Sequence, residues 1–512
     1  MLDVRNAMRR SAGFHRGRIA VVSGDRRLTY GEAWDRGVRL ANALLGLGLD
    51  AGDRVAVLED NCIAASDFFL ATAIANLVRV PLYKRNSREA HQHMLRNTEC
   101  RAVVVAEEYL SEIDGLQTEL PSLEHVIVRD ATYEAWLASQ SVVDPDPPVS
   151  LDDFYVIRHS AGTTGIPKGI SFTHRAWMQT ERDWTFLMPP IELGDHCIHV
   201  GPISHGSGYL FLPTWLAGGC NVLESKFDAD RMLRLLSEVG GVAFAVPTMI
   251  ADLLAVAQKG AWSFPHLKAL VISGAPIRRQ TALAAREVFG PRLYQLYGQT
   301  ECVPVVFMGP NEWFGDVPGS DPLGAVGRVM PFAELEIRDD DGHVLPTGEV
   351  GEIAARADGQ MVRIWNDPDL TAKRIVDGWV LTGDIGALDE NGFLYLRDRK
   401  DDMIISGGFN IWPAELEVAI AELPGVREVV VFGVPDERWG ETPMAVVVLA
   451  DGATVNEQDV IAICRERLGS YKRPSTVRLQ HEPLVRTPVG KISRKSLREP
   501  YWSGHASRIG GS

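Results

Sequence analysis

Short apolar runs alternate along the chain with longer stretches in which apolar residues recur at helical spacing. The runs at 55–58, 102–106 and 269–272 consist of Val, Ala, Leu and Ile and predict buried strands. Residues 30–47 carry the spacing of an amphipathic helix. Strands that alternate with helices are typical of layered α/β folds. We therefore expect a large N-terminal region of layered α/β subdomains.

The pattern changes near residue 333. The segments 334–338, 351–356 and 393–397 predict strands, and the Asp-Gly and Asn-Gly pairs at 341–342 and 391–392 predict hairpin turns. This part is expected to form a β-rich subdomain of mainly antiparallel strands.

A helix is predicted to begin near Pro413, since proline suits the first helical turn and apolar residues follow at helical spacing. The sequence after it predicts a small, compact C-terminal α/β unit. We expect one domain at 1–401 and a second, smaller domain at 402–512.

Composition and charge limit the kinds of partner that the protein is expected to bind. The 512 residues exceed what one core usually holds, and the formal net charge of -15 argues against a nucleic acid or an anionic membrane surface as partner. No uncharged apolar run of about 18 residues predicts a membrane span, and the Arg-rich N-terminus lacks the apolar core of a secretory signal. The six dispersed cysteines are expected to be free thiols. We expect a cytoplasmic protein with no stable membrane anchor and no nucleic-acid partner.

Residues 160–169, Ser-Ala-Gly-Thr-Thr-Gly-Ile-Pro-Lys-Gly, follow a predicted strand at 154–158. Glycines allow a close backbone approach, and hydroxyls with a lysine can bind phosphate oxygens. The segment differs from a Walker A loop, because Lys168 follows proline and precedes glycine. Taken alone, it also fits an ordinary Gly/Pro turn.

Three further polar segments follow: Tyr-Gly-Gln-Thr-Glu at 297–301, Thr-Gly-Asp at 382–384, and Thr-Pro-Val-Gly-Lys at 487–491. A ring, a hydroxyl and a carboxylate suit base stacking, phosphate contact and Mg²⁺ binding. Each segment alone also fits a strand end, a solvated turn or a surface lysine. Their joint occurrence predicts a site that activates a carboxylate with ATP.

In this order the motifs resemble those of the adenylate-forming superfamily, which includes acyl-CoA synthetases, firefly-type luciferases and nonribosomal-synthetase adenylation domains. The resemblance spans roughly residues 15–500 and is nearest in appearance to bacterial acyl-CoA synthetases. It implies ATP and Mg²⁺ as cofactors. By this resemblance, the pyrophosphate end of ATP is held by Thr163, Thr164, Gly165 and Lys168; the adenine is stacked by Tyr297; the adenine and acyl pockets are lined by Gly274 and Ala275; phosphate is contacted by Thr300; Mg²⁺ is bound by Glu301; and ribose is bound by Asp384 and Arg399.

The resemblance also implies roles near the C-terminus. Residues 1–401 bind ATP and the acid, and residues 402–512 form a mobile lid that carries the loop with Lys491, with ATP between the two. Lys491 bridges the substrate carboxylate and the α-phosphate during adenylation, and Asp402 is the hinge of the lid. The family's usual lysine before the hinge is replaced here by Asp401. Ser406, Gly407 and Gly408 are expected to border the channel for the acceptor.

His205 matches the family position that borders the carboxylate pocket. A metal site is the rival hypothesis, since His196, Cys197 and His199 lie nearby in the sequence, but alternation along a strand would place His196 and Cys197 on opposite faces. A buried, fully hydrogen-bonded core histidine is a third interpretation of His205.

We expect an AMP-forming ligase that activates a carboxylic acid as acyl-AMP, releases pyrophosphate and transfers the acyl group to CoA. The alternative is a stand-alone amide synthetase in which an amine captures the adenylate, with His199 and His205 flanking the acceptor entrance. An inactive nucleotide-binding regulator is disfavoured by the complete set of motifs. Aromatic residues in the pocket region favour an aromatic or cyclic acid: Trp184, Phe186, Tyr209, Phe211, Trp215 and Phe244.

Overall fold

The computed structural model describes residues 2–161, 167–186, 188–406, 409–436, 438–469, 472–486 and 492–503. The chain divides into two compact units. Unit 1 comprises Met1–Leu335, Ala354–Leu381 and Glu390–Leu394, and unit 2 comprises Glu336–Ile353, Thr382–Asp389 and Tyr395–Ser512. The predicted fold class, α/β layers with a β-rich part and a small C-terminal α/β part, is confirmed.

The first sheet of unit 1 has the strand order β18-β8-β7-β4-β3-β5-β6. Strands β4, β3, β5 and β6 are parallel, and β7 and β8 form an antiparallel hairpin. Strands β3, β4 and β5 are buried over nearly their whole length, as strands inside a parallel sheet are. The strands are β3 Arg54–Leu58, β4 Val78–Pro81, β5 Ala102–Ala106, β6 His125–Arg129, β7 Phe154–Ala161, β8 Pro167–Thr173 and β18 Arg363–Ile364.

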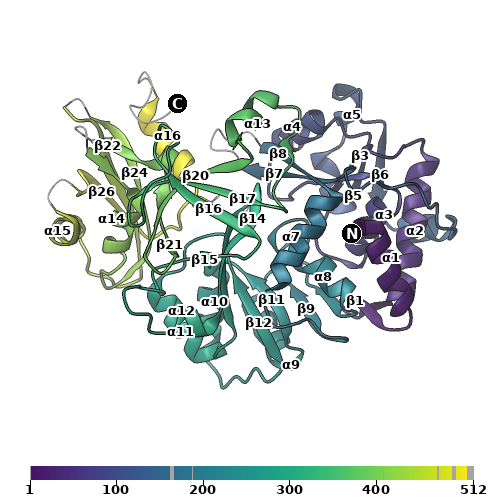
Figure 1. Cartoon of the computed structure of the whole chain (residues 1–512), viewed down its shortest axis with the longest axis horizontal. Coiled ribbons are helices and arrows are strands. Elements are labelled where there is room, and N and C mark those ends of the chain that lie inside the picture. The colour runs from purple at the N-terminus through teal and green to yellow at the C-terminus, as the bar shows by residue number, and fades with distance from the viewer. Residues whose placement is uncertain are drawn as a thin grey trace. The chain divides into compact units, whose positions relative to one another are not determined.

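Helices cover this sheet (Figure 1). Helix α2 begins with a capping box, in which the Thr29 hydroxyl and the Glu32 carboxylate each accept a backbone N–H of the other residue. Helix α7 contacts β7 and β8 of this sheet and β14 of the next one. The helices are α1 Val4–Phe14, α2 Tyr30–Gly46, α3 Ile63–Ile74, α4 Arg88–Thr98, α5 Leu116–Glu119, α6 Tyr133–Ala138 and α7 His174–Phe186.

The second sheet contains the order β15-β14-β13-β12-β11-β9-β10-β1-β2 within unit 1. Strands β1, β10, β9, β11, β12 and β13 are parallel, so their carboxyl ends lie along one edge. The strands are β1 Ile19–Ser23, β2 Arg26–Thr29, β9 His196–His199, β10 Cys220–Leu223, β11 Gly241–Ala245, β12 Leu267–Ile272, β13 Leu293–Gln299, β14 Cys302–Met308 and β15 Gly327–Val329.

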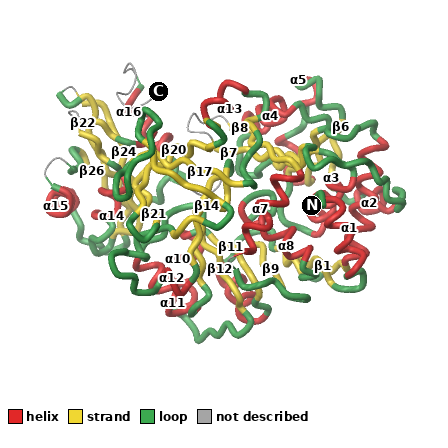
Figure 2. Tube along the Cα trace, viewed as in Figure 1, coloured by secondary structure: helices red, strands yellow, loops and turns green. Residues whose placement is uncertain are grey.

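Helices α10 and α11 lie beside β11 and β12, as Figure 2 shows. The helices of this layer are α8 Phe211–Leu216, α9 Ala229–Glu238, α10 Pro247–Ala257, α11 Arg279–Phe289, α12 Pro310–Trp313 and α13 Pro368–Arg374. The predicted β-rich part corresponds to β16 Ala333–Arg338, β17 Gly351–Ala357, β19 Ile375–Val376, β20 Trp379–Leu388 and β21 Phe393–Arg399. Strands β16, β17, β20 and β21 contribute residues to both units.

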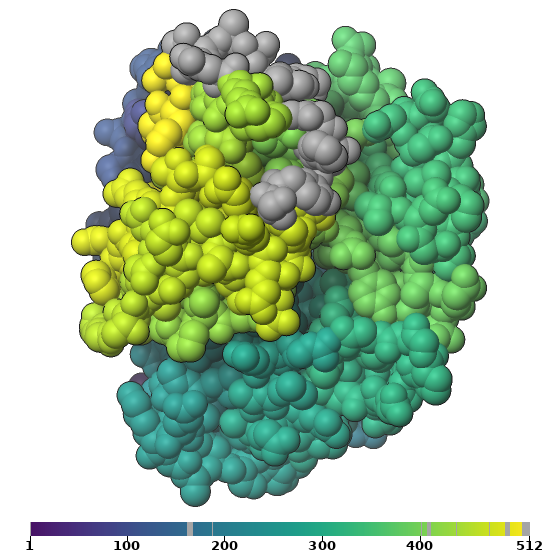
Figure 3. All heavy atoms as spheres, turned by 90° about the vertical axis from the view of Figure 1, so that its left-hand side faces the viewer, coloured from purple at the N-terminus to yellow at the C-terminus, as the bar shows by residue number. Residues whose placement is uncertain are grey.

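Unit 2 is built around a sheet of order β23-β22-β25-β24, with β26 paired to β25. Along β24, Val429 and Val431 belong to one apolar cluster and Val430 and Phe432 to another, so alternate residues bury the two faces. The elements from residue 404 onward contribute the yellow-green and yellow surface that faces the viewer in Figure 3. They are β22 Ile404–Ser406, β23 Phe409–Ile411, β24 Val426–Asp436, β25 Gly440–Leu449, β26 Thr476–Gln480, α14 Pro413–Ile420, α15 Glu457–Leu468 and α16 Arg494–Trp502.

No helix in the described ranges combines the length and the apolar character needed to cross a bilayer. The predicted domains meet at one point in the chain, residue 402. The two compact units are divided differently, because each consists of several segments of the chain. That boundary stays a prediction.

Candidate active site

A tight hairpin carries Thr300 and Glu301 at its tip. Strands β13 and β14 are antiparallel, and Gln299 pairs with Cys302, so these two residues form the turn between them. Gly298 precedes the turn where the strands approach most closely: a Cβ there would lie 2.8 Å from the carbonyl oxygen of Cys302. Tyr297 is buried at the end of β13. The Tyr-Gly-Gln-Thr-Glu motif is thus a rigid strand end with a polar tip.

The Glu301 side chain fits the expected role in Mg²⁺ binding. Its backbone carbonyl oxygen accepts a hydrogen bond of 2.7 Å from the Met361 N–H, which fixes the main chain. Within the described residues, its half-buried carboxylate has no hydrogen bond or ion pair, so both oxygens can serve a cation. Mg²⁺ in nucleotide sites is usually held by one or two carboxylates together with phosphates, so one well-placed carboxylate suffices.

The neighbouring parallel strands bring other predicted residues to the same edge of the sheet. Gly274 and Ala275 follow β12 in an exposed loop, and Gly274 has φ +88°, which glycine adopts without strain. A Cβ on Gly274 would lie 3.4 Å from Val246 Cγ1, so the loops after β11 and β12 are in contact. Ligands of α/β sheets typically bind at the carboxyl ends of the strands.

His205 lies in the loop that follows β9. Its Nδ1 is 2.8 Å from the Ser204 hydroxyl oxygen, and its ring centroid is 4.7 Å from that of Tyr83. Burial, reinforced by the positive charge of Arg158, lowers the pKa of His205 to about 3. The imidazole is therefore neutral at pH 7 and binds as a hydrogen-bonding group and not as a cation.

Asn61, which the sequence analysis missed, holds this loop in place. Its amide donates to the carbonyl oxygens of His199 (3.1 Å) and Gly201 (2.8 Å), and its oxygen accepts the Ile203 N–H at 2.9 Å. Gly208 is required at the end of the loop, since a Cβ there would lie 1.8 Å from the Ile203 carbonyl oxygen. Asn61 is 138 to 142 positions away in the sequence from the residues it contacts, so sequence spacing gave no signal for it.

His199 does not flank an acceptor entrance, and this part of the sequence interpretation was wrong. The side chain is fully buried, with Nε2 at 2.8 Å from Asn221 Oδ1 and Nδ1 at 2.8 Å from the Ser207 hydroxyl. Burial lowers the pKa of His199 to about 4. Both ring nitrogens have partners, so this histidine is a hydrogen-bonded part of the core and has no nitrogen left for the rival metal site.

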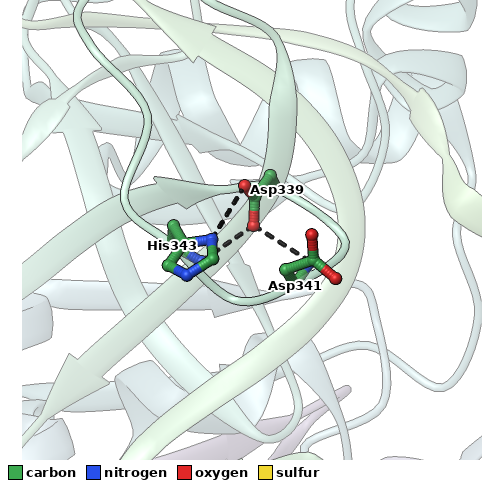
Figure 4. Close-up of side chains that lie close together, drawn as sticks. All are labelled: Asp339, Asp341 and His343. Carbon is green, nitrogen blue, oxygen red and sulfur yellow. Dashed lines mark hydrogen bonds and ion pairs between the residues drawn. The ribbon is translucent and has the colours of Figure 1, made fainter.

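Within the described part of the chain, the one group of three potential metal ligands is Asp339, Asp341 and His343. Figure 4 shows them in the turn after β16. Asp339 Oδ1 accepts the backbone N–H of Asp341 at 3.0 Å and of His343 at 2.8 Å, and Oδ2 lies 3.2 Å from His343 Nδ1. These bonds account for the turn, and the group is largely exposed.

Lys168 lies on β8 opposite Ser160 of β7, so the hairpin places it beside the start of the predicted phosphate loop. The loop residues Thr163, Thr164 and Gly165 lie outside the described residues. The same holds for Lys491, Gly407 and Gly408. Ser406 ends β22, where it pairs with Gly440 of β25 and Phe409 of β23.

In unit 2 the two residues predicted to bind ribose come together. Arg399 Nε is 3.3 Å from Asp384 Oδ1. The Thr382 hydroxyl supports this pair: it donates to the Ile353 carbonyl oxygen at 2.7 Å and accepts the Asp384 N–H at 3.1 Å. Asp402 pairs with Arg494, whose Nη1 lies 3.1 Å from Asp402 Oδ2.

The six aromatic residues of the predicted pocket region separate into three groups. Phe211 and Trp215 are fully buried in the core, where Phe211 packs on Phe69 and Trp215 on Tyr30, each with ring centroids 4.4 Å apart. Phe186 is exposed. The remaining three form one ring cluster, in which Trp184 stacks on Tyr209 and is tilted against Phe244.

Comparison with known proteins agrees with this geometry. Residues 8–365 match the AMP-binding enzyme family, and residues 415–491 match the AMP-binding enzyme C-terminal domain. A fatty acid–[acyl-carrier-protein] ligase, ScoC of Streptomyces coeruleorubidus, is 31% identical over 500 residues, covering 96% of this chain and 95% of the relative. A feruloyl-CoA synthase of Amycolatopsis sp is 33% identical over 490 residues, covering 94% and 96%.

Among solved structures, the amide bond synthetase McbA from Marinactinospora thermotolerans superposes with a TM-score of 0.86. It is 27% identical, and the match covers 98% of this chain and 100% of that one. The family match over most of the chain, together with relatives above 30% identity along nearly its whole length, settles its membership. This chain belongs to the AMP-binding enzyme family and is an AMP-forming ligase of the adenylate-forming superfamily, close to bacterial acyl-CoA synthetases.

Proposed function

We propose that the protein activates an aromatic or cyclic carboxylic acid with ATP and transfers the acyl group to the thiol of CoA. The observation that carries this proposal is the shared sheet edge, where the hairpin tip with Glu301 and the loops with Gly274 and His205 meet. The feruloyl-CoA synthase relative supports both the CoA acceptor and an aromatic acid. The ring cluster of Trp184, Tyr209 and Phe244 also supports an aromatic or cyclic acid.

In the first half-reaction, a carboxylate oxygen attacks the α-phosphorus, the bond from that phosphorus to the bridging oxygen breaks, and pyrophosphate leaves. Both reactants are anionic and charge builds at phosphorus, so positive groups are needed there. Lys168, with Thr163, Thr164 and Gly165, holds the phosphates, and Lys491 bridges the carboxylate and the α-phosphate. Glu301 would hold Mg²⁺, which supplies positive charge at the phosphate oxygens.

Other residues position the reactants. Tyr297, Gly274 and Ala275 contact the adenine, and Thr300 contacts phosphate. The pair Asp384 and Arg399 binds the ribose hydroxyls, because a carboxylate accepts and a guanidinium donates hydrogen bonds to them. His205, neutral at pH 7, borders the acid carboxylate.

In the second half-reaction, the CoA sulfur attacks the acyl carbon, AMP leaves, and the thiol proton is released. We propose that the lid, residues 402–512, turns about Asp402 for this step and that Ser406, Gly407 and Gly408 border the thiol channel. Such closure and reopening is common among enzymes with two half-reactions. The protein is proposed to act in the cytoplasm.

A stand-alone amide synthetase is the second candidate, in which an amine nitrogen replaces the thiol sulfur. The close structural likeness to the amide bond synthetase McbA favours keeping it. Product analysis separates the two: a thioester that requires CoA supports the first, and an amide formed without CoA supports the second.

Lys491→Ala tests the proposed division of labour. Acid-dependent pyrophosphate release should fall about 100- to 1000-fold, the usual loss for one preorganised donor at a charged transition state. Thioester formation from supplied acyl-adenylate should change little. Lys495→Ala, four residues later and paired with Glu499, is the matched control and should affect neither step. Equal losses in both half-reactions would refute the role of Lys491.

A further inference from the structure

Unit 1 buries three charged side chains that the proposed chemistry does not use. Arg79 on β4, Arg158 on β7 and Glu181 on α7 are 3%, 6% and 3% exposed. Arg79 lies opposite Val156 in the parallel pair of β4 and β7, and Arg158 follows Val156 by two positions. Both arginines therefore rise from the same face of the sheet, the face that α7 also contacts.

Aromatic rings surround these groups. The Arg79 guanidinium carbon is 4.0 Å from the ring centroid of Phe69, and that of Arg158 is 4.4 Å from Tyr209. Tyr209 is stacked between Trp177 and Trp184, with centroid distances of 5.3 and 4.9 Å. The arginines thus lie against ring faces in a site with low polarity, where an unpaired charge interacts strongly with any ion that enters.

The polar atoms of this cluster are not satisfied by one another. Arg79 Nε, Arg158 Nη1 and both carboxylate oxygens of Glu181 have no hydrogen-bond partner within the described ranges, and neither do the Tyr209 hydroxyl and Trp184 Nε1. Within the described residues no salt bridge joins Glu181 to either arginine, although both guanidinium charges act on its carboxyl group. Buried polar groups are nearly always paired, so these atoms are open to a partner such as an ordered water or a bound ligand.

The charges favour an anion as that partner. Two guanidinium groups face a single carboxyl group, and burial raises the pKa of Glu181 well above its usual range, which favours its neutral form. The cluster therefore carries an excess of positive charge.

The cluster adjoins the proposed acid site. Trp184 leads from Tyr209 to Phe244, with centroids 6.1 Å apart, and the Phe244 ring lies 3.0 Å from where a Cβ on Gly206 would stand. Gly206 is the neighbour of His205, whose pKa is lowered first by burial and further by the positive charges of Arg158 and Arg79. A continuous line of rings thus runs from the loop that carries His205 to the Arg158 guanidinium.

We propose that Arg158 and Arg79 form the remote end of the acid site and bind a second anionic group of the substrate, so that the enzyme selects acids with a carboxylate besides the activated one. This proposal rests on the acid-activating function proposed above. Guanidinium groups bind carboxylates through charge-assisted, often bidentate hydrogen bonds, which is the chemistry the unpaired donors provide.

The test compares monoacids with their diacid analogues, benzoate with terephthalate and hexanoate with adipate, in pyrophosphate–ATP exchange. The wild-type protein should use a diacid with kcat/KM about 10- to 100-fold above that of its monoacid, the range expected for a hydrogen bond to a charged group. Arg158→Met, of similar length, should abolish this preference: kcat/KM for the diacid should fall to about that for its monoacid, while kcat/KM for the monoacid should change far less. Glu181→Gln should retain the preference, since the amide resembles the neutral carboxyl group.

Arg286→Met is the matched control, because Arg286 also lies over a ring, Phe314 at 5.1 Å, but in α11. Equal use of monoacids and diacids by the wild-type protein would overturn the inference and leave the proposed function intact. An equal loss with both acids in Arg158→Met would also overturn it, since that is the result of a purely structural role. If no acid supports pyrophosphate–ATP exchange, both proposals are overturned.

Discussion

Because the imidazole of His199 is buried, we predict that low pH destabilises unit 1. Substituting His199 alone separates its contribution from that of other titrating groups. Burial holds the pKa of His199 at about 4, against about 6.5 in an unfolded chain. Between these values the unfolded chain binds one more proton at this site than the fold does. The contribution to stability is therefore complete above about pH 6.5 and is lost as the pH falls toward 4.

The magnitude follows from the two pKa values. One proton bound only by the unfolded chain lowers the free energy of unfolding by about 1.4 kcal/mol for each pH unit, or about 3 kcal/mol across the whole interval. Protonation also turns Nδ1 from an acceptor of the Ser207 hydroxyl into a donor. His199→Gln removes the titrating ring, so the free energy of unfolding should depend less steeply on pH by about 1.4 kcal/mol per unit.

Urea unfolding, followed by tryptophan fluorescence from about pH 7 to about pH 4.5, measures this slope. Ser207→Ala is the control, because it removes one hydrogen bond of His199 and keeps the ring. It should lower stability by about 1 kcal/mol at every pH and keep the wild-type slope. Identical slopes for His199→Gln and the wild-type protein would refute the reasoning.

Two further substitutions test the active-site edge. Glu301→Gln should lower acid-dependent pyrophosphate release about 100-fold and raise the Mg²⁺ concentration needed for half-maximal rate, because it removes the charge that would hold the cation. A Mg²⁺ titration measures this concentration, and an unchanged value would contradict the prediction. Gly208→Ala should lower the thermal midpoint and kcat/KM together, since its Cβ meets the Ile203 carbonyl oxygen and the loop with His205 must shift. Gly46→Ala, where the new Cβ meets nothing within 4 Å, should change neither.

Elements whose residues carry their own pattern were predictable from the sequence. The apolar runs at 55–58, 102–106 and 269–272 became β3, β5 and β12 with ends shifted by no more than two residues. The helix expected at 30–47 became α2, Tyr30–Gly46. Local propensity and periodicity suffice in these places because burial on both faces of a parallel strand requires continuous apolar character.

The site was predictable only where the motif itself folds into the site. Thr300 and Glu301 form a hairpin tip because Gln299 pairs with Cys302, a local arrangement. The contacts of Asn61 depend on elements far away in the chain, so no local pattern indicates them. Spacing also could not distinguish His199 from His205, since only the fold brings Asn221 to the ring of His199.

The sequence does contain a signal for the site of the buried arginines. Arg158 ends an otherwise apolar strand segment, and Arg79 interrupts another, Leu-Val-Arg-Val-Pro at 77–81. A charged residue inside a parallel strand must be buried, and burial is costly without a partner. Such an interruption therefore indicates a polar site, although the identity of its neighbours, such as Glu181 on α7, requires the fold.

The ion pairs around Asp402 limit how the proposed hinge can be tested. Arg494 lies three positions after Lys491 and contacts Asp402 at 3.1 Å, Asp398 at 3.3 Å and Glu417 at 2.7 Å. Substituting Asp402 therefore changes an ion-pair network that also anchors the segment following the proposed catalytic lysine. Asp402→Pro should slow the second half-reaction. Asp402→Asn is the control, because it weakens the same ion pair and keeps the backbone free to rotate. The slower rate of Asp402→Pro reflects the proposed hinge backbone only if Asp402→Asn retains the wild-type rate.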